Sequence, residues 1–294
     1  MLQSPEQNSI VGEPLTGFEK IADREKIFSS LTRTGFKGNI NEELINRLIL
    51  FERESTFNED ARLIERGMDN VLYFLEKHSK DKQSRLVLTE EQKINGRLAA
   101  LLHDIGKSGP AHANREEQEA VIKLYAIESI NTPSCSVGDI VAERFDKQQA
   151  EELLGKLAAC LVFPEMTMRQ FWNLHAKWTY ELLLKYPEGL NNHIQIIAGS
   201  HHLDNGISPH ILLKTNAPLK SDIIETLGGE VNDLEERILM VVDKYQAVVR
   251  RGGVDHEAAI AWVRNNLVKY GKDDSLQSVI DAVDELGKQD KIFV

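Results

Sequence analysis

The chain has 294 residues, of which 41% are hydrophobic and 28% charged, and its formal net charge is −11. This length and composition suit one large or two modest folded domains and exclude a disordered chain. The acidic balance argues against binding to bulk nucleic acid, which needs a basic face. The acidic balance does not exclude a small anionic substrate, because bound metal ions and a few cationic side chains can reverse the electrostatic potential locally.

The sequence gives no sign of a membrane segment or of secretion. The first twenty residues hold no apolar run of signal-peptide length, and no stretch approaches the roughly 18 apolar residues of a membrane helix. The two cysteines, Cys135 and Cys160, have no motif spacing and indicate unpaired thiols in a reducing compartment. We therefore expect a cytoplasmic protein without a membrane partner.

Helical periodicity dominates the chain. In 59–77 the apolar residues recur with a 3.6-residue period, as in an amphipathic helix. Thr89 followed by Gln92 predicts a capping box at the start of the next helix, which stops at Gly106. Further helices are predicted at 41–52, 115–130, 147–162, 168–185, 191–202, 233–250 and 255–269. Turn-rich breaks are predicted at 131–139, 204–218 and 227–232. Alternating strand patterns are nearly absent, so the predicted fold is all-α.

Residues 1–55 form an N-terminal extension that starts without clear patterning and becomes helical at 41–52. This segment is too short for an independent domain. We expect it to pack on the main body, residues 56–294, or on a second copy of the chain. A homodimer is therefore a further expectation.

Histidine and aspartate residues recur where apolar helices end or pass. The set comprises His103, Asp104, His175, His201, His202 and Asp243. Each residue alone is a weak signal, because short motifs recur by chance. Together they lie in four separate helical segments, and unpaired imidazoles and carboxylates are costly to bury, so a shared metal would explain the whole set. Imidazoles and carboxylates without thiolates suit Mn, Fe or Zn.

The segment LLHDIGK, residues 101–107, resembles the signature of the HD phosphohydrolase superfamily. Later landmarks resemble its HD-GYP branch, the bacterial cyclic-dinucleotide phosphodiesterases. In chain order they are Pro164 ahead of His175, the pair His201-His202, and the helix ERILMVVDKYQAVV around Asp243. The resemblance covers about residues 60–270. It implies an HD-domain helical bundle with an inserted helical segment at about 111–160.

The resemblance also implies a role for each residue. It implies that His103, Asp104 and Asp243 hold one divalent ion and that His175, His201 and His202 hold a second, with Asp104 bridging. Fe or Mn is expected, and Zn would also fit. Asp104 and Lys107 would be catalytic, and Lys107, Arg250 and Arg251 would bind phosphate. The implied reaction is hydrolysis of a cyclic dinucleotide, such as cyclic di-GMP, by a hydroxide held between the ions.

The chain departs from the HD-GYP pattern in ways that keep other functions open. No histidine stands near Arg66 or Gly67, where the family places its first ligand, and LDNGISP replaces the Gly-Tyr-Pro signature. An acid such as Glu59 or Glu65 is expected at that position if both ions bind tightly. One alternative is a nucleotide phosphomonoesterase. The other is a catalytically silent HD module that binds a nucleotide or a protein partner.

Overall fold

The computed structural model describes residues 17–54, 57–79, 88–127, 133–202, 234–267 and 274–294. These residues contain no strand, only an isolated bridge between Ser136 and Thr167, so the predicted all-α class is confirmed. The α-helices are α1 (Gly17–Arg33), α2 (Glu42–Glu54), α3 (Phe57–Ser79), α4 (Glu90–Leu102), α5 (Arg115–Tyr125), α6 (Val137–Arg144), α7 (Lys147–Ala159), α8 (Met168–Lys185), α9 (Asn192–Gly199), α12 (Leu234–Gly252), α13 (His256–Leu267) and α14 (Asp274–Lys288). A short 3₁₀ helix, η2 (Ile105–Ser108), follows α4.

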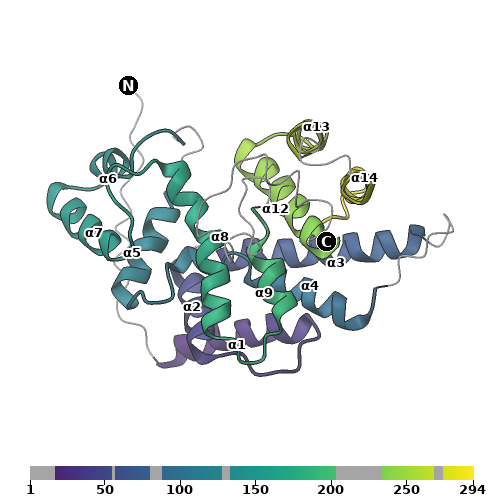
Figure 1. Ribbon diagram of the computed structural model, residues 1–294, viewed down its shortest axis with the longest axis horizontal. Helices are drawn as coiled ribbons and strands as arrows, with labels where there is room; N and C mark the ends of the chain where they lie inside the picture. The colour runs from purple at the N-terminus through teal and green to yellow at the C-terminus, as the bar shows by residue number, and fades with distance from the viewer. Residues whose placement is uncertain (1–16, 55–56, 80–87, 128–132, 203–233, 268–273) are drawn as a thin grey trace.

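The centre of the molecule is built by α3, α4, α8, α9 and α12, which pack against one another (Figure 1). Two of these helices begin with a complete capping box. Thr89 accepts from the backbone of Gln92 at the start of α4, and Thr167 accepts from Gln170 at the start of α8. Each box satisfies backbone donors that the first helical turn leaves unpaired. The sequence pattern identified the first of them.

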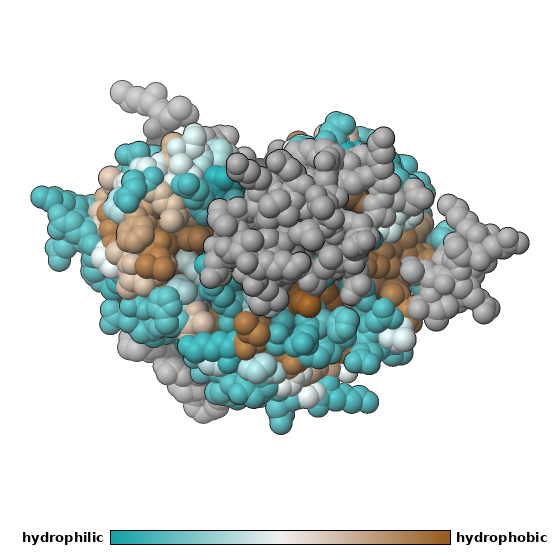
Figure 2. All heavy atoms as spheres, viewed as in Figure 1, coloured by the Kyte–Doolittle hydropathy of each residue, from teal (hydrophilic) through white to brown (hydrophobic). Residues whose placement is uncertain are grey.

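The N-terminal extension packs on the main body. Helix α2 contacts α1, α3, α5 and η2, and α1 contacts α4. Arg47 on α2 is fully buried, and its guanidinium donates to the carbonyls of Ser108, Gly109 and Pro110. The helix at Gly17–Arg33 was not predicted. On the face shown in Figure 2, hydrophilic residues predominate along the lower edge, where α1 lies in Figure 1.

The predicted insertion at 111–160 carries α5, α6 and α7. One prediction here was wrong, because α6 begins at Val137, inside the turn-rich break expected at 131–139. Ser136 caps this helix by accepting from the backbone of Asp139, and Val137 and Ile140 are buried. Tertiary burial thus makes a helix of a segment whose composition is typical of a turn.

Helix α14 was also not predicted, and it packs on α3, α12 and α13. The breaks expected at 204–218 and 227–232 lie outside the described residues. Within the part of the chain that the structure describes, no helix is both long and apolar enough to cross a membrane.

Candidate metal centre

Four segments bring the predicted ligands to one place. His103 and Asp104 form the turn between α4 and η2, and His175 lies in the middle of α8. His201 and His202 follow the end of α9, and Asp243 lies on α12. All of them are buried except His202 and Asp243, which are partly buried. The structure therefore juxtaposes all six residues that the sequence pattern selected.

Asp104 lies at the middle of this group. Its Oδ1 atom is 3.2 Å from Nε2 of His175 and 3.9 Å from Nε2 of His201. Its Oδ2 atom is 3.5 Å from Nε2 of His103 and 2.5 Å from Nζ of Lys107. The Nε2 atom of His103 is also 3.7 Å from Oδ1 of Asp243. The two carboxylate oxygens of Asp104 thus face different sets of ligands, as a bridging carboxylate requires.

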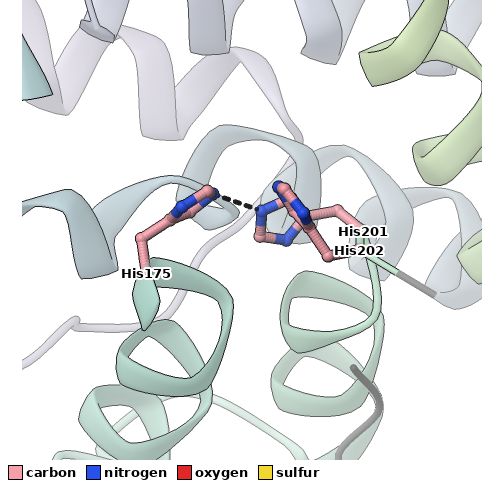
Figure 3. Close-up of side chains that lie close together, drawn as sticks. All are labelled: His175, His201 and His202. Atoms are coloured by element: carbon pink, nitrogen blue, oxygen red, sulfur yellow. Dashed lines mark hydrogen bonds between the residues drawn. The ribbon is translucent and has the colours of Figure 1, made fainter. Parts of the chain in front are cut away.

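The other half of the centre is an imidazole cluster made of His175, His201 and His202 (Figure 3). One ring nitrogen from each of the three residues falls in a group whose members all lie within 4.8 Å of one another. The Nε2 atoms of His175 and His201 are 2.9 Å apart. This spacing is short enough for a single cation to contact several nitrogens after small adjustments, since zinc–nitrogen bonds are roughly 2 Å long.

Backbone carbonyls fix the tautomer of three rings. The Nδ1 atom lies 2.7 Å from the carbonyl of Ala100 for His103, 2.5 Å from that of Trp172 for His175, and 2.7 Å from that of Ala198 for His201. A carbonyl only accepts, so each Nδ1 must carry the proton and donate it. Each neutral ring is then left with a lone pair on Nε2, the atom that points at the centre.

These lone pairs face one another and the oxygens of Asp104. The contact between the Nε2 atoms of His175 and His201 (dashed in Figure 3) becomes a hydrogen bond only if one ring takes a second proton. Burial opposes this and lowers the pKa of His175, and it lowers the pKa of His201 well below the usual value. Acceptors held this close need a proton or a cation between them. The donor set therefore fits a metal ion.

Both carboxyls and His202 are held in the forms that suit a metal, whereas His103 is not. Burial lowers the pKa of His103, but Asp104 and Asp243 outweigh it and raise this pKa, so a bound cation would have to displace a proton from the ring. Burial raises the pKa of Asp104, but His103 and Lys107 outweigh it and hold this carboxyl well below its usual pKa. Burial likewise opposes ionisation of Asp243, yet Lys244 and His103 lower its pKa. Burial lowers the pKa of His202 well below normal. Anionic carboxylates and neutral imidazoles are the forms that bind metals.

A close helix approach holds the two halves of the centre together. Gly106 on η2 lies so near α8 that an added Cβ would be 2.1 Å from the carbonyl oxygen of His175. The Thr179 hydroxyl donates to the carbonyl of His103 at 2.7 Å and accepts from the backbone of Gly106 at 3.0 Å. The sequence analysis did not identify Gly106 and Thr179 as part of the site. The glycine directly after the His-Asp turn was the available signal.

The predicted phosphate contacts lie in different surroundings. Lys107 is buried, with its ammonium on Asp104 and 4.8 Å from the centroid of the Phe57 ring. Arg250 pairs with Asp60 of α3 at 2.7 Å. The side chain of Arg251 lies outside what the structure describes. Lys107 is therefore in contact with a predicted ligand, Asp104.

Helix α3, where the family's first ligand would stand, places other residues there. Arg66 is exposed, and Gly67 packs against Val242 of α12, whose Cγ1 would be 2.6 Å from an added Cβ. Of the acids expected as substitutes, Glu65 is buried and pairs with Arg33 at 2.6 Å, while Glu59 is exposed. With these contacts, His103, Asp104 and Asp243 are the described residues that would hold a first ion.

Comparison with known proteins finds no matching family model, no matching curated sequence and no matching solved structure. The resemblance to the HD superfamily therefore depends on the sequence motifs.

Proposed function

We propose that the chain is a metal-dependent phosphohydrolase whose substrate is a phosphodiester, with a cyclic dinucleotide such as cyclic di-GMP as the expected class. The observation that supports this most is the convergence of Nε2 lone pairs from His103, His175 and His201 on the carboxylate of Asp104. Bound divalent ions would supply a nucleophile near neutral pH and offset negative charge on phosphate oxygens.

Two of the chain's own residues, Asp104 and Lys107, would have the remaining roles. Asp104 is ionised and lies between the ligands of the two ions. Its Oδ2 atom faces His103 and its Oδ1 atom faces His175, so it would bridge the ions. Lys107 uses one ammonium proton on Asp104 and has two more, which can donate to a phosphate oxygen of the substrate. Burial strengthens that interaction, because the low local dielectric weakens screening.

A second candidate is a silent module that binds a nucleotide without hydrolysing it. The residues of α3 favour this candidate. Glu65 pairs with Arg33 and Arg66 is exposed, so neither supplies the ligand that the first ion would lack. The missing ligand is expected to make the first ion bind more weakly than the second ion, which would have three imidazoles and Asp104 as ligands. The choice between the two candidates thus depends on whether both ions bind.

Metal content and hydrolysis measured together test the proposal. Protein reconstituted with Mn²⁺ or Fe²⁺ is expected to bind two ions of unequal affinity and to hydrolyse cyclic di-GMP faster than p-nitrophenyl phosphate. His175→Asn should lose the tighter ion and the activity, whereas His193→Asn, at an exposed position on α9, should keep both. Absence of hydrolysis at saturating metal would favour the silent module, and preference for the monoester would favour a phosphomonoesterase.

Lys107→Met is expected to keep the metal and lose activity. The methionine retains an apolar stem against Phe57 but removes the ammonium, so kcat/KM should fall by roughly 100-fold, as for a lost charge-stabilising donor. Lys177→Met on α8, which removes a half-exposed lysine paired with Glu181, is the matched control and should be neutral. Loss of metal in Lys107→Met would show that Lys107 supports the centre instead of the substrate.

A further inference from the structure

A groove with a volume of about 1030 Å³ separates the N-terminal helices from the inserted segment. Its walls are α1, α2, residues 111–114, the start of α5 and the end of α8. None of the six predicted metal ligands is among the described residues that line it. Its volume matches the upper end of small-molecule sites, which span roughly 300–1,000 Å³.

Cationic side chains outnumber carboxylates among the described residues that line the groove, although the chain as a whole is acidic. Of the described residues, Arg24, Arg53, Arg115 and Lys185 line it, against a single carboxylate, Glu43. In a protein of net charge −11, such a local excess of cationic side chains favours an anionic ligand.

Of these cations, Lys185 is open to a ligand, and Arg115 can exchange an exposed partner for one. Lys185 is exposed and donates to the carbonyl of Ala111 at 2.8 Å, and it pairs with no carboxylate among the described residues. Arg115 pairs with Glu119 on the helix surface, where both side chains are nearly half exposed and the pair contributes little. The two arginines from α1 and α2 already hold carboxylates and are less available.

Buried hydrogen bonds fix the floor of the groove. Glu43 accepts from Arg47 at 2.8 Å and from Gln118 at 3.3 Å, and Gln118 also donates to the carbonyl of Ala113 at 2.9 Å. Arg47 in turn holds the carbonyl of Gly109 at 3.1 Å. The walls are therefore set before a ligand arrives, which reduces the entropy lost on binding.

Beside the cations the groove offers an apolar face for a ring. Tyr186 and Ile49 line it, and the ammonium of Lys185 lies 5.2 Å from the centroid of the Tyr186 ring. We propose that this groove binds a nucleotide, with its phosphates at Arg115 and Lys185 and its base against Tyr186. The site is separate from the metal centre and does not depend on the function proposed for that centre.

Calorimetric titration of ATP into the full chain, stripped of metal with a chelator, tests the proposal. Saturable binding is expected, and it should weaken as salt is raised, because the exposed cations are screened. The double variant Arg115→Gln/Lys185→Gln should weaken ATP binding by about tenfold or more, because two charge-assisted contacts are lost. Arg144→Gln/Lys147→Gln removes the same charges from exposed positions outside the groove and should leave ATP binding unchanged.

Further titrations test where ATP binds and which part of it is recognised. His175→Asn should bind ATP as the unchanged chain does, since the groove does not include the metal centre. Pyrophosphate should bind more weakly than ATP, and guanosine, which has no phosphate, should not bind detectably. The proposal is overturned if ATP does not bind, if the groove variant binds as tightly as its control, or if pyrophosphate matches ATP.

Discussion

Asp104→Asn is expected to abolish metal binding and, with it, any hydrolysis. Oδ1 of Asp104 faces His175 and His201, and Oδ2 faces His103 and Lys107. An amide replaces one of these oxygens by an NH₂ group, which donates protons where a cation must bind, and it removes the charge that neutralises the ion. Metal content per chain, measured by mass spectrometry after reconstitution, should fall to background.

The same substitution should also destabilise the protein without metal. It leaves the buried ammonium of Lys107 without its anionic partner, and breaking such a buried pair costs about 3 kcal/mol or more. Asp139→Asn, at an exposed position on α6, is the matched control for both measurements. If Asp104→Asn kept both ions, Asp104 could not be the bridging ligand, and the assignment of the centre would be wrong.

The candidate metal centre could be recognised in the sequence because the free-energy cost of burying its imidazoles and carboxylates is visible there. His175 and Asp243 have apolar neighbours along their helices, and such neighbours predict burial of groups that need a partner. The pattern does not reveal which carbonyl fixes each ring, or that Thr179 joins η2 to α8. Those contacts depend on how far one helix is from the next, which periodicity does not encode.

One of the helices that were missed, α6, has a clear physical cause. Helix α6 spans only eight residues and starts in a segment rich in Ser, Gly and Pro. Short helices of this kind are stabilised by the surface they bury and not by propensity. The groove could not be predicted either, because its cations come from 24–53, from Arg115 and from Lys185, which only the folded chain brings together.

Gly106→Ala is expected to disrupt the fold of the centre more than any other single methyl addition at a glycine of α4, η2 or α7. The new Cβ would lie 2.1 Å from the carbonyl oxygen of His175 and 2.5 Å from the backbone nitrogen of Thr179. Both are backbone atoms of α8, so relief requires η2 and α8 to separate as whole elements. Overpacking of this kind costs about 3 kcal/mol.

Separation of η2 from α8 would also move ligands apart, because Asp104 immediately precedes η2 and His175 lies on α8. Chemical denaturation should show the loss in free energy of unfolding, and metal titration should show weakened binding of the ion held by His175. Gly155→Ala is the control, since Gly155 is exposed on α7 and an added Cβ meets nothing within 4 Å. That change should stabilise the chain by roughly 0.5–1 kcal/mol, because alanine has the higher helix propensity. Equal stability of the two variants would mean that η2 does not approach α8 this closely, and the juxtaposition of Asp104 with His175 would have to be revised.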